Sequence, residues 1–188
     1  MHIAVFGGAF DPPHLGHLNV ARVLLEQNHA DEVWFMPVND HPFAKKMSPS
    51  AERVALLKLM IEPRMKIELL ELKSPETSFT LHSLRTLKKR YPQHSFSFVI
   101  GADNVADFTK WHHYAALLNE FIVWVYPRVG SSLEQVLPGM QILTAVQPVT
   151  VSSTQAREAL QEGRSVAGLL SEQVAHYCRE RKLYIKKG

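Results

Sequence analysis

Short runs of branched and aromatic residues recur along this chain, and a helical pattern follows most of them. The first run, IAVF within residues 2–7, is continuously apolar, which is typical of a strand buried on both faces. We expect further strands at residues 32–37, 65–72, 95–101, 121–126 and 141–146. Strands that alternate with helices form parallel sheets, because each crossover helix returns the chain to the same end of the sheet.

The segments between these runs carry apolar residues at helical spacing, as Leu18, Ala21 and Leu24 do after the first run. In residues 48–61, Ser48 suits an N-cap with Pro49 at the first helical position, and the predicted inward stripe is Val54, Leu57 and Ile61. Further helices are expected at residues 80–91, 112–120, 152–163 and 169–182. The sequence therefore predicts a doubly wound, Rossmann-like α/β fold with a parallel sheet, helices on both faces and a helical C-terminus.

Composition narrows the class of protein further. The 188 residues are 46% apolar, so we expect one domain over residues 1–188. There is no apolar run long enough to span a bilayer and no export signal at the start, which favours a cytoplasmic protein without a membrane partner. The net charge of +3 is spread out and lacks clustered aromatics, so no nucleic-acid partner is expected. The single cysteine, Cys178, is expected to be an inert helix residue.

The stretch GGAFDPPHLGH, residues 7–17, directly follows the first predicted strand, where ligands bind in such folds. Gly7 and Gly8 are predicted to let the backbone turn sharply and approach a ligand closely. Two prolines then fix the chain as it enters the helix. His14 and His17 share one face of the first helical turn, where imidazoles beside free N–H groups suit phosphate oxygens.

Two other interpretations of this stretch remain open. One is a glycine-proline turn that carries surface histidines without a ligand. The other is a zinc site, but zinc needs three or four ligands, and no paired cysteines or HExxH pattern accompanies these histidines. The adjacent His112 and His113 point to different faces of a helix and do not complete a site. We therefore expect phosphate ahead of zinc, and no protein metal site.

The stretch VSSTQAREAL, residues 151–160, marks a second helix start that suits an anion. Ser152 and Gln155 have capping-box spacing, which by itself predicts no more than a well-capped helix. Ser153, Thr154 and Arg157 add two hydroxyls and a planar guanidinium, which can hold the same anion as the helix N-terminus. Two such helix starts indicate a polyphosphate bound between them.

Both stretches resemble motifs of the nucleotidylyltransferase superfamily, GxFDPxHxGH and ISSTxxR, in the expected order. SPSAERVALLKLMI, ETSFTLHSL, FVIGADNVADFTKW and the C-terminal LLSEQVAHYCRERKLY are similar to one branch, the bacterial nicotinate mononucleotide adenylyltransferases. The chain departs from that branch at NDHPFAKKM, where the family has a PPHK-type loop, and at Phe79, where it has tyrosine. The resemblance covers nearly the whole chain.

The resemblance implies transfer of the adenylyl group of ATP to nicotinate mononucleotide, with release of pyrophosphate and formation of deamido-NAD. By resemblance, His14 and His17 contact the ATP phosphates, and the pyrophosphate end is held by Ser153, Thr154 and Arg157. By resemblance, Gly7, Gly8 and Phe10 also line the path of the nucleotide, and Lys45 or Lys46 neutralises phosphate charge. Gly101 and Asp103 lie at the carboxyl end of a predicted strand, where nucleotides bind in such folds. Mg²⁺ is expected to bridge the phosphates mainly through substrate oxygens and water.

Several residues keep two interpretations. Asp11 is expected to fix a turn, whereas Asp103 either accepts ribose hydroxyls or caps the next helix. Trp111 either stacks on the pyridine ring or packs in the core, and Thr80 is expected to donate to the acceptor carboxylate. Other acceptors such as phosphopantetheine, cytidylyl transfer, a catalytically silent nucleotide-binding module and a homo-oligomer all stay open.

Overall fold

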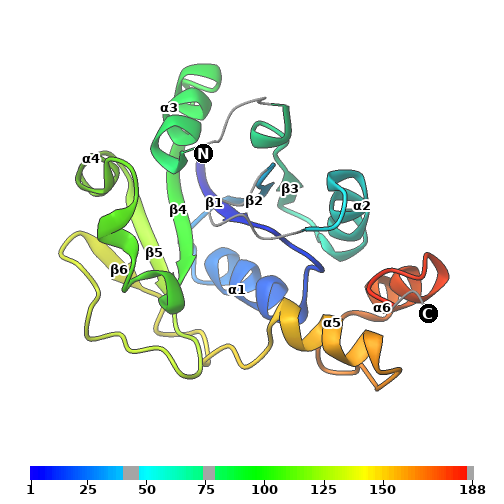
Figure 1. The fold of residues 1–188 in the computed structure, drawn as a ribbon. Coiled ribbons are helices and arrows are strands. Elements are labelled where there is room, and N and C mark those ends of the chain that lie inside the picture. Colours follow the sequence, from blue (N-terminus) through cyan, green and yellow to red (C-terminus); the bar gives the residue numbers. More distant parts are fainter. Residues whose placement is uncertain (40–46, 74–78, 186–188) are drawn as a thin grey trace.

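The computed structural model describes residues 1–39, 47–73 and 79–185 of the chain (Figure 1). The strands are β1 (His2–Gly8), β2 (Glu32–Pro37), β3 (Met65–Ile67), β4 (Ser95–Gly101), β5 (Ile122–Tyr126) and β6 (Met140–Ile142). The α-helices are α1 (Leu15–Glu26), α2 (Ser50–Met60), α3 (Thr80–Arg90), α4 (Tyr114–Glu120), α5 (Ser153–Gln161) and α6 (Glu172–Glu180). Short 3₁₀ turns are η1 (Glu71–Lys73), η2 (Ala102–Asn104) and η3 (Phe108–Lys110). Within these ranges no helix is both long and apolar enough to cross a membrane.

The six strands form one sheet in the order β3-β2-β1-β4-β5-β6, and every neighbouring pair is parallel. This order confirms the doubly wound, Rossmann-like fold. The strand order reverses at β1, so the connections leave β1 and β4 on opposite sides of the sheet. The crevice outside the carboxyl ends of these two strands is the place where such sheets bind ligands.

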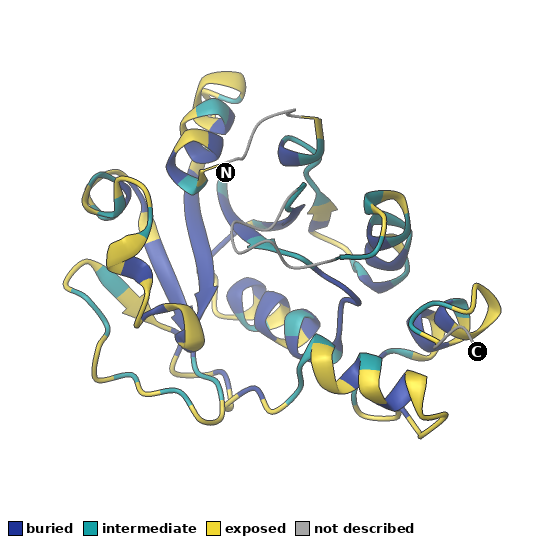
Figure 2. Ribbon diagram, in the orientation of Figure 1, coloured by how far each residue is buried: buried dark blue, intermediate teal, exposed yellow. Residues whose placement is uncertain are grey.

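Side chains of the sheet alternate between two cores. On β1, Ala4 and Phe6 join the core under α1, α2, α5 and α6, whereas Ile3 and Val5 join the core under α3 and α4. A strand covered on both faces needs apolar residues at every position, which explains the continuous run in the sequence. Figure 2 shows the result: the central strands are buried, and the outer faces of the helices are exposed.

Three elements differ clearly from their predicted form. The last strand, predicted for residues 141–146, is Met140–Ile142. The strand predicted for residues 65–72 ends at Ile67, because the chain turns into η1 and buries Glu71 against Ser83 of α3. The N-cap position of α2 is Pro49 rather than Ser48, and its side chain makes no capping hydrogen bond. The buried face of α2 is also shifted from the predicted stripe, and it consists of Arg53, Leu56, Leu57 and Met60.

Candidate active site

The candidate site lies at the carboxyl end of β1, where a loop of six residues leads into α1. Gly7 and Gly8 belong to β1 itself, and neither has a positive φ, so the predicted glycine turn is wrong. The chain turns at Phe10, which has a φ of 50°, and the peptide bond between Asp11 and Pro12 is cis. Glycine at position 7 serves close packing instead, because a Cβ atom there would lie 2.9 Å from the ring of Phe98.

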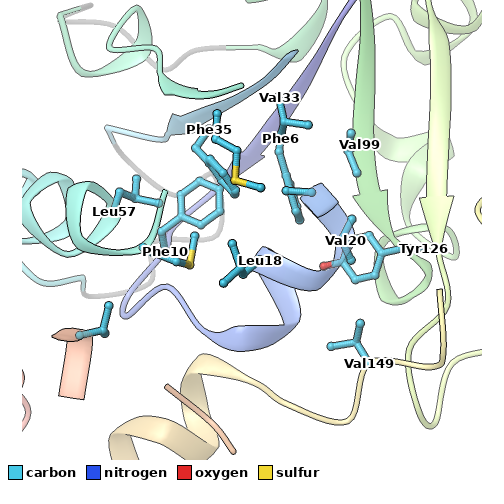
Figure 3. Packing of buried hydrophobic residues seen from close by; sticks show 14 of the residues in the cluster. Phe6, Phe10, Leu18, Val20, Val33, Phe35, Leu57, Val99, Tyr126 and Val149 are labelled. Atoms are coloured by element: carbon cyan, nitrogen blue, oxygen red, sulfur yellow. The ribbon is translucent and has the colours of Figure 1, made fainter. Parts of the chain in front are cut away.

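The side chain of Phe10 is only 1% exposed, so it does not line an open path for the ligand as predicted (Figure 3). Its ring packs edge-on against the rings of Phe6, Phe35 and His17, with the His17 centroid 5.0 Å away. An apolar ring is held in this core by the hydrophobic effect. Phe10 therefore packs against the imidazole of His17 and fixes one side of that ring.

His14 and His17 form a stacked pair at the start of α1. His14 occupies the N-cap position, and the two ring centroids are 3.6 Å apart with an interplanar angle of 23°. The backbone N–H of His14 donates to Nδ1 of His17 at 3.2 Å. When Nδ1 of a neutral imidazole accepts a hydrogen bond, the proton sits on Nε2. The Nε2–H group is therefore the hydrogen-bond donor of the His17 imidazole.

Both imidazoles are neutral at physiological pH. Burial lowers the pKa of His14 to about 3, and the cation of Arg128 contributes to the shift. Burial lowers the pKa of His17 well below its ordinary value as well, with His14 and Arg128 adding to it. Each of these neutral imidazoles keeps one N–H donor. Because their pKa values are lowered, the two rings stay uncharged between pH 6 and 8. Among the described residues, Nδ1 of His14 is buried without a hydrogen-bond partner.

The close packing around the pair depends on Gly16, which the sequence analysis did not single out. A Cβ atom at this position would lie 2.5 Å from Cγ1 of Val149 and 2.9 Å from Nδ1 of His14. Any side chain here would displace the imidazole from its place at the helix N-terminus. The glycine between the two histidines of the motif is thus a packing requirement, which only the tertiary structure reveals.

Helix α5 begins beside the opening loop, although the two are far apart in the sequence. Its predicted capping box is present, because Ser152 Oγ accepts from the backbone N–H of Gln155 at 3.2 Å and Gln155 Oε1 accepts from that of Ser152 at 2.8 Å. Ser153 Oγ donates to the carbonyl of Pro12 at 2.9 Å. The structure therefore brings the two helix starts together, as the two motifs predicted.

Arg157 also spans α5 and the opening loop. It donates from Nη1 to the carbonyl of Asp11 at 2.6 Å and from Nη2 to Thr154 Oγ1 at 3.1 Å. Its side chain is half-buried, whereas Thr154 is exposed. Since a guanidinium has five N–H donors, these two bonds leave others for an anion.

The segments after β4 and β5 add a pair of opposite charges, and the cation of this pair, Arg128, acts on both histidines. Gly101 ends β4, and Asp103 in η2 accepts from Nη1 of Arg128 at 3.2 Å. Asp103 is exposed and makes no capping hydrogen bond, so the capping alternative is wrong. Arg128, whose side chain is 21% exposed, was missed by the sequence analysis. It lies in no recognised motif, and only the order of the strands places it beside α1.

The residues expected to bind the acceptor lie near one another on the α3 side of the sheet. Thr80 is the first residue of α3, and the neighbouring ring of Phe79 stacks on His112 with centroids 4.3 Å apart. Trp111, next to His112, is half-buried. Its ring centroid lies 5.0 Å from that of Phe108 and 6.2 Å from that of Phe98. Part of its ring thus packs in the core, as one of the two interpretations expected. Lys45 and Lys46 lie outside the described residues.

The described residues contain no group of three or more histidine, cysteine, aspartate or glutamate side chains that could hold a metal ion. The imidazole, hydroxyl and guanidinium groups that converge here are hydrogen-bond donors, which suit phosphate oxygens. Mg²⁺ instead prefers carboxylate, carbonyl and water oxygens as ligands. Asp11 and Asp103 are already hydrogen-bonded to other groups. The side chains present are therefore a poor fit to Mg²⁺ on their own.

Comparison with known proteins places this arrangement in a family. The model of the cytidylyltransferase-like family matches residues 5–159, which include both helix starts. The chain belongs to this family. Among curated relatives of this cytidylyltransferase-like protein, the nicotinate-nucleotide adenylyltransferase of Bacillus subtilis is 37% identical over 186 residues, covering 97% of both chains. A protein of Oceanobacillus iheyensis, named a probable nicotinate-nucleotide adenylyltransferase, is 36% identical over 97% of this chain and 96% of its own.

Solved structures agree with the fold of the cytidylyltransferase-like family. The nicotinic acid mononucleotide adenylyltransferase of Plasmodium falciparum, solved in complex with NaAD, superposes with a TM-score of 0.82 at 21% identity and 97% coverage of both chains. The same enzyme in complex with APC gives a TM-score of 0.80 at 20% identity, covering 97% of this chain and 96% of that one. Together with the curated relatives, the family shows that this member is a nucleotidyltransferase enzyme.

Proposed function

We propose that this enzyme transfers the adenylyl group of ATP to nicotinate mononucleotide, releasing pyrophosphate and forming deamido-NAD. The observation that carries the proposal is the stacked, neutral His14–His17 pair at the N-terminus of α1, with the start of α5 docked beside it. The full-length relatives named for nicotinate nucleotide support the choice of acceptor.

The transfer needs no nucleophile from the protein. A phosphate monoester has a second pKa of about 6, so the acceptor phosphate is already an ionised nucleophile near neutral pH. The one thiol of the chain, Cys178, is buried, and burial raises its pKa to about 12, so it stays protonated. Catalysis is then mainly positioning of the two substrates and stabilisation of the charge that develops on the phosphates.

We assign the ATP phosphates to the space between α1 and α5. The Nε2–H group of His17 donates to a phosphate oxygen, His14 lies beside it, and Arg128 supplies positive charge. Ser153, Thr154 and Arg157 hold the departing pyrophosphate. Asp103 accepts from the ribose hydroxyls, and Gly101 lets the nucleotide approach the end of β4.

For the acceptor, Thr80 donates to the carboxylate of the nicotinate ring, and the N-terminus of α3 favours the same anion. The face of Trp111 that is not packed against Phe108 stacks on the pyridine ring. Mg²⁺ bound together with ATP would supply charge neutralisation at the phosphates, and the described side chains would not have to hold it. The protein's side chains contribute by forming hydrogen bonds to the two substrates and by orienting them.

We also propose that residues 1–188 make up a single nucleotidyltransferase domain. The two cores lie on opposite faces of one sheet, and both ends of the chain contribute to the same site.

The proposal is tested by pyrophosphate release from ATP and Mg²⁺ with a panel of acceptors: nicotinate mononucleotide, nicotinamide mononucleotide and phosphopantetheine. We expect the highest kcat/KM with nicotinate mononucleotide. Thr80→Val and Trp111→Ala should raise KM for that acceptor and leave KM for ATP nearly unchanged. Equal kcat/KM for the two mononucleotides, or a preference for phosphopantetheine, would contradict the acceptor assignment. No turnover with any acceptor would indicate a nucleotide-binding module instead.

A further inference from the structure

The loop between β1 and α1 is held by contacts from several distant parts of the chain. The buried guanidinium of Arg53 on α2 donates from Nη1 to the carbonyl of Ala9 at 2.8 Å. Ser153 and Arg157 of α5 donate to the carbonyls of Pro12 and Asp11, as described above. All of these bonds act on backbone carbonyls, so they fix the path of the loop rather than the conformation of one side chain.

The carboxylate of Asp11 ties the same loop to two further segments. Asp11 is 5% exposed, and its Oδ2 accepts from the backbone N–H of Ser48 at 3.0 Å. Its Oδ1 accepts from the phenol of Tyr184 at 2.6 Å. Tyr184 lies four residues after the end of α6 at Glu180, so a residue near the C-terminus contacts the loop that precedes the histidine pair.

The segment that carries Tyr184 is itself anchored away from the site. On α6 and just beyond it, Tyr177 Oη donates to Glu52 at 2.9 Å and Arg181 Nη2 donates to the same carboxylate at 3.1 Å. Glu52 lies on α2, so these two bonds hold α6 against α2 and do not touch the loop. Tyr184 and Tyr177 thus use the same kind of hydrogen bond for two different contacts.

We propose that Tyr184 is a positioning residue for the adenylyl transfer, acting through Asp11 on the turn that places His14 and His17. The inference rests on the proposed function. Only Pro12 and Pro13 separate Asp11 from His14, and the fixed φ angles of two prolines leave little slack between them. A shift of the Asp11 carboxylate is therefore transmitted to the N-cap imidazole and to the ring stacked on it.

The test compares Tyr184→Phe with Tyr177→Phe, since each variant removes one phenolic hydroxyl bonded to a carboxylate and keeps the ring. We expect Tyr184→Phe to lower kcat about 10-fold or more at an unchanged KM for the acceptor, because a displacement of about 1 Å costs up to about 100-fold in rate. Tyr177→Phe should lower Tm to a similar extent and leave kcat within about twofold of the wild type. Equal kcat in the two variants would overturn the proposal.

A spectroscopic readout keeps the test independent of turnover. The ¹⁵N chemical shifts of the imidazole rings of His14 and His17 report their hydrogen bonding, and we expect them to change in Tyr184→Phe but not in Tyr177→Phe. Unchanged shifts in both variants would also overturn the proposal. If the wild-type protein transfers no adenylyl group, the proposed function fails, and the ring shifts still decide whether Tyr184 positions the pair.

Discussion

At the scale of single residues, the proposed site depends on two imidazoles that burial keeps neutral. We predict that His17→Ala lowers kcat by about 100-fold or more with a small change in KM for ATP, because a donor aimed at developing charge stabilises the transition state more than the bound substrate. Steady-state kinetics measures this, and His176→Ala is the matched control, since that imidazole is exposed on α6. A near-native kcat in His17→Ala would contradict a catalytic role of this histidine and would indicate that the motif is only a structural turn.

The buried His14 also makes stability depend on pH. Its pKa is about 3 in the folded protein and 6.5 in the unfolded chain, so below pH 6.5 the unfolded chain binds a proton that the folded protein does not. Stability falls as the pH drops from 6.5 towards 3, by up to about 1.4 kcal/mol per pH unit for one such group. His14→Gln should reduce this slope in urea unfolding between pH 6 and pH 4, whereas His176→Gln should not. An unchanged slope in His14→Gln would contradict the burial effect.

The sequence predicted some of these residues and missed others for physical reasons. His14 and His17 share a helical face, and Ser153 and Arg157 follow a capping pattern, so local spacing was enough to find them. Arg128 was missed because a single arginine after a strand has no local signature. Its position near the histidines comes from strand order, which places β5 two strands from β1.

At the scale of elements, the start of α3 is linked to η1 through a buried carboxyl group. Glu71 is 4% exposed and accepts from Ser83 Oγ at 2.7 Å, and burial raises its pKa to about 7. The unfolded chain loses this proton above pH 4.5 while the folded protein keeps it up to about pH 7. Glu71 therefore opposes folding increasingly as the pH rises from 4.5 to 7.

We predict that Glu71→Gln, which keeps an acceptor for Ser83 but cannot ionise, raises the free energy of unfolding at pH 8 by on the order of 2 kcal/mol relative to the wild type. At pH 4 the two proteins should be nearly equal. Urea unfolding at both pH values measures the difference, and Glu158→Gln on the exposed face of α5 serves as the control. The same difference at pH 4 and pH 8 would show that ionisation of Glu71 is not its cause.

Elements with continuous apolar runs were the easiest to predict, because burial on both faces leaves a clear pattern. The segments 32–37 and 95–101 match β2 and β4 at both ends. The face of α2 was harder, because its buried set includes Arg53, which donates to the carbonyls of Ala9 and Val38. Arg53 is buried because its guanidinium donates to backbone carbonyls. The spacing of apolar residues predicts only apolar buried positions, so it could not identify this residue.

At the scale of the whole molecule, the sheet order brings the two ends of the chain to one site. The motifs predicted that the starts of α1 and α5 cooperate, and the hydrogen bond from Ser153 to Pro12 agrees with it. They did not predict the contact between Tyr184 and Asp11, because no spacing in the sequence relates residues so far apart. The site is thus a product of topology as much as of motif.

The stereochemical course of the reaction follows from this arrangement. The measurement uses ATP in which one sulfur atom replaces an oxygen on the α-phosphorus, so that this phosphorus is chiral. A single diastereomer serves as the substrate, and nicotinate mononucleotide is the acceptor. Direct attack in line with the departing pyrophosphate inverts the configuration at phosphorus, so we predict deamido-NAD with inverted configuration. Retention would contradict direct transfer, because it requires two displacements through an adenylylated side chain, and the absence of any dinucleotide product would contradict the proposed reaction itself.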